Sequence, residues 1–71
     1  QSRAFNEACV GKTMDVLLTG PGRHEGQLVG RSPYLQPVHV MADATLIGQI
    51  RPLTIAAAVS NSLMAAPESS R

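Results

Sequence analysis

Residues 26–42, "GQLVGRSPYLQPVHVMA", carry the clearest strand pattern of the sequence. Apolar and polar residues alternate on both sides of an interruption that holds two prolines and a tyrosine. Alternation with a period of two residues is typical of half-buried strands. We therefore predict a strand over 27–32, a loop, and a further strand over 38–41 with its valines inward and its histidine outward.

The residues before this stretch continue the same pattern. Alternation over 12–18 predicts another strand, whose inward positions are Met14, Val16 and Leu18. The sequence "GPG" at 20–22 ends this strand, because glycine and proline favour turns. The region therefore predicts two neighbouring strands joined by a glycine-rich hairpin loop.

A long apolar stretch over 46–59 contains a change of parity, because Ile50 has one parity and Leu53 the other. Pro52 stands at the change and cannot donate a hydrogen bond to a strand ladder. We therefore predict a bulge or a corner at Pro52, of the kind that small barrels use to close. After the turn sequence "VSNS", a short last strand is predicted over 63–66.

The segment 54–66, "TIAAAVSNSLMAA", is ambiguous, because its apolar spacing and its alanines also fit a helix. Asn61 and its flanking serines favour a turn between two strands instead. Five short strands with tight turns predict an all-β fold, a small antiparallel barrel of the OB-like or SH3-like kind. We expect the barrel over 9–66, a lead-in over 1–8 and a flexible polar tail over 67–71.

The composition of the 71 residues fits one small domain with an aliphatic core, because the chain has one tyrosine, one phenylalanine and no tryptophan. The net charge of +1 does not by itself indicate nucleic acid. Cys9, the single cysteine, excludes an internal disulfide. We expect no signal peptide and no membrane-spanning segment, and a start at Gln1 is typical of a piece of a longer protein.

No arrangement of residues predicts catalysis, since the acidic residues are scattered and no nucleophile elbow is present. The plausible metal ligands are Cys9, His24, Glu25 and His39. His24 and His39 are too far apart in the sequence for a local site, so we expect two exposed or partly exposed histidines and not a metal site. The loop sequence "GPGRHEG" lacks the spacing of a dinucleotide fingerprint. We interpret it as a hairpin loop whose tip projects Arg23 and His24, side chains that can meet a phosphate.

Arg31 closes a predicted strand beside Gly30, which leaves room for an approaching backbone, and Tyr34 follows in a Ser-Pro-Tyr loop. An arginine fork beside an aromatic face suits single-stranded RNA. The pattern fits structural roles equally well. Arg31 can be a solvated strand residue, and Tyr34 can plug the barrel. The stem of Arg51 can cover the apolar edge of the barrel. The candidate RNA-binding residues are Lys12, Arg23, His24, Arg31, Tyr34 and Arg51.

Several motifs together resemble those of a known family. They are "AFN" at 4–6, "VGK" at 10–12, "PGRHEGQLVGRSPYLQPVHV" at 21–40, "LIG" at 46–48 and "NSLMA" at 61–65. With them the chain resembles the TRAM domain, and more narrowly the C-terminal TRAM domain of dimethylallyladenosine tRNA methylthiotransferases, which are radical-SAM enzymes. The resemblance covers about residues 4–66, and the long central motif carries most of its specificity.

The resemblance implies a five-stranded antiparallel barrel, which resolves 54–66 as strand. It also implies an RNA-binding accessory domain, a monomeric part of a cytoplasmic enzyme, that holds tRNA near its anticodon for the catalytic radical-SAM domain of the same chain. The 4Fe-4S clusters and S-adenosylmethionine of such enzymes belong to other domains, and Cys9 lies in none of their motifs.

Two further hypotheses stand beside RNA binding. A structural docking domain would pack on the catalytic domain with little direct RNA contact, and an independent enzyme is the third alternative. The first two differ in whether the basic residues gather on one face of the barrel, which only a structure can show.

Overall fold

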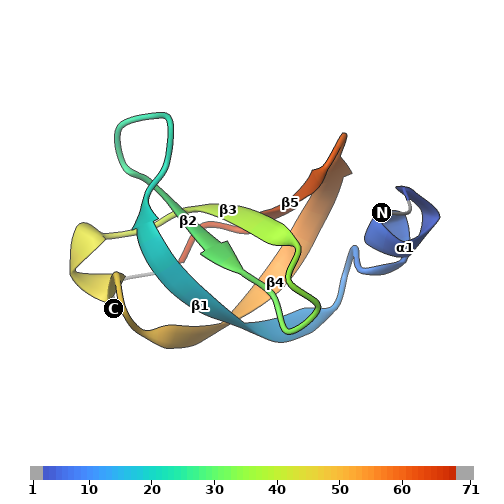
Figure 1. Ribbon diagram of the computed structural model, residues 1–71, viewed down its shortest axis with the longest axis horizontal. Coiled ribbons are helices and arrows are strands. Elements are labelled where there is room, and N and C mark those ends of the chain that lie inside the picture. Colours follow the sequence, from blue (N-terminus) through green and yellow to red (C-terminus); the bar gives the residue numbers. More distant parts are fainter. Residues whose placement is uncertain (1–2, 69–71) are drawn as a thin grey trace.

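Five strands and two short helices follow one another along residues 3–68, the part of the chain that the computed structural model describes. The helices are α1 (Arg3–Ala8) and the 3-10 helix η1 (Ala44–Leu46). The strands are β1 (Thr13–Pro21), β2 (Gln27–Arg31), β3 (Pro37–Met41), β4 (Ile50–Val59) and β5 (Ser62–Ala65). Figure 1 shows the strands curling around one another, with α1 at one end of the barrel. Within residues 3–68, neither helix is long and apolar enough to cross a membrane.

The strands close into a barrel in the order β1-β2-β3-β5-β4, and β4 returns to pair with β1. The predicted small closed all-β barrel is therefore confirmed. One pairing departs from a wholly antiparallel arrangement, because β3 and β5 run parallel, with Val38 opposite Leu63. Parallel neighbours need a long crossover connection, and here η1 and β4 provide it.

The barrel core is aliphatic, as the composition predicts. Inward positions of all five strands fill it, and neither aromatic residue belongs to it. The predicted parities of β1 and β3 are confirmed, and the ambiguous segment 54–66 forms strand, turn and strand. The buried apolar residues are Cys9, Val16, Leu18, Leu28, Val38, Val40, Leu53, Ile55, Leu63 and Ala65.

The predicted bulge at Pro52 is wrong. Pro52 pairs with Asp15 in regular register, and the register shift lies between Ile55 and Ala57. The shift lies in the pairing of β4 with β5, whereas Pro52 belongs to the pairing of β4 with β1. At Thr54 and Ile55 the β4 backbone is hydrogen-bonded on both sides, to Ala66 and to Lys12. The parity change in the sequence has another cause, because Ile50 is 65% exposed and lies outside the core.

Gly30 has a different role from the one expected. An added Cβ would overlap the carbonyl oxygen of Leu17 and lie 2.9 Å from Val16 Cγ1. The backbone that approaches Gly30 therefore belongs to β1 of the same domain, and Gly30 itself is buried. The missing side chain lets β1 and β2 pack closely and leaves no room there for a ligand.

The connection between β3 and β4 is held against β1. The Asp43 carboxylate caps η1 by accepting a hydrogen bond from the Thr45 backbone N–H at 2.9 Å. That N–H, and after it the Thr45 hydroxyl, lowers the pKa of Asp43 below its ordinary value. Beyond η1, the N–H of Gly48 donates to the Leu18 carbonyl at 2.7 Å, which places the start of β4 beside β1.

The close approach at Gly30 predicts a large effect of a single methyl group. Gly30→Ala should lower the free energy of unfolding by about 1–3 kcal/mol, because overpacking forces the β1 backbone away. Gly20→Ala is the matched control, since an added Cβ there meets nothing within 4 Å. Urea unfolding of both variants checks the prediction, and equal stability of the two would contradict it.

Candidate nucleic-acid interface

The β2–β3 loop, residues 32–36, is organised by a buried serine. The Ser32 hydroxyl accepts hydrogen bonds from the backbone N–H groups of Tyr34, at 3.1 Å, and Gln36, at 3.2 Å. It donates in turn to the Gln36 side-chain oxygen at 2.7 Å. The loop backbone around Tyr34 is therefore fixed from the inside of the domain, although the Tyr34 side chain is exposed.

Gln36 extends this arrangement to the N-terminal helix. Its side-chain amide donates to Asn6 Oδ1 at 2.6 Å and lies 3.7 Å from Cys9 Sγ. Ser32, Gln36 and Asn6 are all buried, so their hydrogen bonds form in a low-dielectric environment where an unmade bond is expensive. We call this chain of three side chains the buried polar network, and it ties α1 to the β2–β3 loop.

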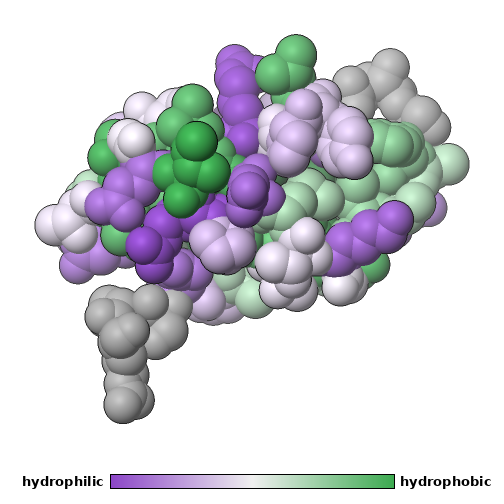
Figure 2. Space-filling model, turned by 90° about the horizontal axis from the view of Figure 1, so that it is seen from below, coloured by the Kyte–Doolittle hydropathy of each residue, from purple (hydrophilic) through white to green (hydrophobic). Residues whose placement is uncertain are grey.

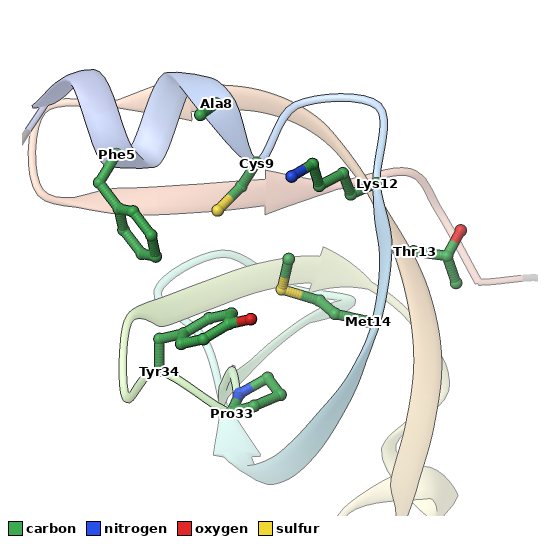
Figure 3. Close-up of a pocket in the computed structure, with 8 residues that line it drawn as sticks. All are labelled: Phe5, Ala8, Cys9, Lys12, Thr13, Met14, Pro33 and Tyr34. Atoms are coloured by element: carbon green, nitrogen blue, oxygen red, sulfur yellow. The ribbon is translucent and has the colours of Figure 1, made fainter.

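The two aromatic rings meet above this network. Phe5 reaches from α1 and Tyr34 from the β2–β3 loop, with ring centroids 5.4 Å apart and an interplanar angle of 89°. Figure 3 shows both rings, the Met14 side chain and the amine end of Lys12 around one cavity between α1 and the loop. This cavity of about 170 Å³ is called the aromatic hollow, and Cys9 and Pro33 also line it.

Arg31 lies in a neighbouring hollow on the outside of β1, β2 and β4. Asp15, Leu17 and Ile50 line it together with Arg31, and its volume is about 260 Å³. Leu17 and Ile50 are 43% and 65% exposed, so the guanidinium group stands beside solvent-facing apolar surface. Figure 2, which views the molecule from below, shows strongly hydrophobic and strongly hydrophilic residues side by side on one part of the surface. Pro33 lines both this hollow and the aromatic hollow.

The β1–β2 loop presents Arg23 and His24 through a second buried glutamine. The Gln27 side-chain oxygen accepts from the backbone N–H groups of Arg23, at 3.0 Å, and His24, at 3.4 Å. Both residues border an open groove of about 410 Å³ that also includes His39. Figure 1 shows this loop extending from the barrel on the side away from α1.

Arg51 is engaged by an acidic partner. Its Nε and Nη2 donate to Glu68 Oε2 at 3.2 and 2.8 Å, and its Nη1 donates to Gln49 at 3.3 Å. The Glu68 backbone N–H also donates to the Met41 carbonyl. The expected tail over 67–71 lies mostly outside the described residues, and its described part, Pro67 and Glu68, is thus joined to β3 and β4.

The six predicted residues therefore fall into separate places. Lys12 joins Tyr34 in the aromatic hollow, and Arg23 joins His24 on the β1–β2 loop. Arg31 lies across Pro33 from the first pair, and Arg51 is bound to Glu68.

The side chains that hold these residues in place were not predicted from the sequence. A signal was present for two of them, because Ser32 and Gln36 continue the inward parity of β2 and β3 beyond the strand ends. A polar residue at an inward position indicates a buried hydrogen bond. Phe5 and Asn6 offered no such signal, since their contacts cross about 30 residues of sequence.

The chain does not fit an iron–sulfur cluster. Such clusters are held by several cysteine thiolates, and Cys9 is the one cysteine of the sequence. Among residues 3–68, no group of three histidine, cysteine, aspartate or glutamate side chains is placed to hold a metal ion. No chemistry of a bound cluster is therefore assigned to this chain.

The closed barrel and its two loops, each held by a buried polar side chain, define a small β-barrel domain with shaped surface hollows. The chain belongs to the TRAM domain family, which matches residues 7–66. It is 57% identical over 63 residues to a tRNA-2-methylthio-N(6)-dimethylallyladenosine synthase of Maricaulis maris (strain MCS10), covering 89% of this chain and 14% of the relative. It is 51% identical over 67 residues to the enzyme of the same name from Sphingopyxis alaskensis, covering 94% of this chain and 15% of the relative.

The buried polar network predicts the effect of removing its central member. Gln36→Ala should lower the free energy of unfolding by about 1–3 kcal/mol, because the buried Ser32 hydroxyl loses its acceptor and Asn6 loses a donor. Gln49→Ala is the control, since Gln49 is exposed and its loss should change stability by about 0.5 kcal/mol or less. Urea unfolding measures both, and tyrosine fluorescence anisotropy of the Gln36 variant should fall as the loop around Tyr34 loosens. An unchanged midpoint for the Gln36 variant would show that the network contributes little.

Proposed function

We propose that this chain is an RNA-binding accessory domain that helps a tRNA-modifying methylthiotransferase hold its tRNA substrate. Membership of the TRAM domain family and the names of the relatives support this function. The structural observation that carries it is the placement of Lys12 and Tyr34 in one hollow and Arg31 in the next, with Pro33 between them.

This arrangement suits a single strand of RNA or the loop of a hairpin. Ammonium and guanidinium groups bind phosphates, and an exposed ring offers a face on which a base can stack. The net charge of +1 limits the contribution of long-range attraction, so shape and stacking must supply much of the affinity. Arg23 and His24 offer further phosphate contacts on the other side of the barrel.

The chain spans about one seventh of the length of the curated relatives that it matches. We propose that the barrel domain occupies 9–66 and that 1–8 leads in from a preceding catalytic domain of a monomeric, cytoplasmic enzyme. In this proposal the other domains hold the iron–sulfur clusters and S-adenosylmethionine, and they add the methylthio group. The present domain contributes affinity for the tRNA near its anticodon and no reacting group.

A specific observation also favours the docking alternative. Leu17 and Ile50 expose apolar surface on neighbouring strands, and Arg31 and Asp15 flank it with opposite charges. A surface of this composition fits a protein partner, in this case the remaining domains of the parent chain. Under this alternative Arg31 serves the contact between domains, and the domain makes little direct contact with RNA.

The comparison of Arg31 with Arg51 tests the proposed function. Arg31→Ala should weaken RNA binding by about 1–3 kcal/mol, the range for a hydrogen bond to a charged group, with little loss of stability. Arg51→Ala should lower stability by about 1 kcal/mol or less through loss of the Glu68 ion pair, and should leave RNA binding nearly unchanged. Thermal melting and titration with an anticodon stem–loop at one fixed salt concentration measure both effects.

Two outcomes of this comparison would count against the proposal. If Arg31→Ala binds the stem–loop as tightly as the wild type, Arg31 is not an RNA contact, and the docking alternative gains. If the unaltered chain does not bind the stem–loop at low salt, the RNA-binding function itself fails for this domain.

A further inference from the structure

Both aromatic residues of the chain lie at its surface. Phe5 and Tyr34 are the single phenylalanine and the single tyrosine, and the sequence has no tryptophan. Phe5 is 44% exposed and Tyr34 is 62% exposed, although aromatic side chains commonly supply the largest buried areas of a domain. The two rings nevertheless touch each other, from elements that are almost 30 residues apart. The barrel core is complete without them, so their packing does not explain why they meet.

The cavity beside the rings has the size and the chemistry of a small site. Its volume of about 170 Å³ is well below the roughly 300–1,000 Å³ of sites for drug-sized ligands, so one flat ring fits and a peptide helix does not. Met14 and Pro33 add apolar walls, and Lys12 brings a positive charge to the same space. Figure 3 shows the Lys12 amine between α1 and the barrel, beside the cavity that the rings also line.

The walls of the aromatic hollow are fixed before any ligand arrives. Ser32 holds the Tyr34 backbone, and Gln36 joins that loop to Asn6 on α1, one residue after Phe5. A site formed in advance binds without the entropic penalty of ordering its parts. The two segments from which the rings project are therefore held in place by buried hydrogen bonds and not by the ligand.

We propose that the aromatic hollow binds one unpaired nucleotide of RNA, with its base against the rings of Tyr34 and Phe5 and its phosphate paired with Lys12. This inference rests on the proposed RNA-binding function and adds to it a site, a class of ligand and a residue, Phe5, that sequence reasoning did not select. A purely apolar partner would bury the Lys12 charge without a counter-ion, whereas a nucleotide supplies one. Sequence-tolerant stacking is the expected mode, because every base has a flat face.

Intrinsic fluorescence tests the proposal directly, because Tyr34 is the sole tyrosine and no tryptophan masks its emission. The probes are hexaadenylate RNA and an oligomer of the same length and charge that lacks the bases. Hexaadenylate should quench the tyrosine emission on binding, since a stacked base contacts the ring. The abasic oligomer should bind more weakly and leave the emission unchanged.

Matched variants test whether the Tyr34 ring itself, and not its hydroxyl or the surrounding loop, binds the base. Tyr34→Ala should weaken hexaadenylate binding by about 5- to 150-fold, the range for loss of one base–aromatic stack, and should abolish any preference over the abasic oligomer. Tyr34→Phe keeps the ring and should bind like the wild type. Leu35→Ala is the control, because Leu35 is a neighbouring, even more exposed apolar residue of the same loop that does not line the hollow. Phe5→Ala should weaken binding in the same sense as Tyr34→Ala, and circular dichroism confirms that each variant is folded.

The outcomes distinguish this site from the general function. If Tyr34→Ala binds hexaadenylate like the wild type while Arg31→Ala or Arg23→Ala binds weakly, the nucleotide site is wrong and the RNA-binding function remains. If no variant changes RNA binding but Tyr34→Ala weakens association with the remaining domains of the parent enzyme, the hollow is a protein contact and the proposal is overturned. Absence of all RNA binding by the folded wild type would overturn the proposed function as well.

Discussion

The buried polar network of Ser32, Gln36 and Asn6 holds the proposed RNA-binding surface in shape. A buried amide or hydroxyl must find partners, because leaving one unpaired costs about 1–3 kcal/mol. Here the partners come from a loop and a helix 30 residues apart, so satisfying them brings α1 and the β2–β3 loop together. The aromatic hollow lies between these two elements and exists only while they stay joined. The buried polar network thus determines the shape of the aromatic hollow on the surface.

The same solution is used at the other long loop. Gln27 is buried and accepts hydrogen bonds from two backbone N–H groups of the β1–β2 loop, and Ser32 accepts from two backbone N–H groups of the β2–β3 loop. In both places a polar side chain from within the domain fixes a backbone that carries exposed, chemically active residues. A small barrel with an aliphatic core has little stability to spare, and this arrangement orders its loops without enlarging the core. Arg51 and Glu68 join the chain after β5 to β4 by an ion pair in a comparable way.

The sequence predicted those features that depend on local periodicity. The parities of Val16, Leu18, Val38 and Val40 predicted the inward faces, and turn residues predicted where strands end. The irregularity in β4 was misplaced at Pro52, because a local rule about proline cannot show where the register with a strand far along the chain shifts. The role of Gly30 was mispredicted for a similar reason, since the backbone that packs against it belongs to β1 and not to a ligand. The meeting of Phe5 with Tyr34 and of Arg51 with Glu68 depends on closure of the whole barrel, which no short pattern encodes.

A nuclear magnetic resonance titration of the isotope-labelled chain with an anticodon stem–loop at low salt locates the RNA contacts residue by residue. We expect amide shifts that gather at Lys12, at Phe5 and along residues 31–36, with a second group in the β1–β2 loop around Arg23. Shifts confined to the apolar surface around Leu17 and Ile50, or a folded chain with no shifts at all, would show that the proposed RNA-binding surface is wrong.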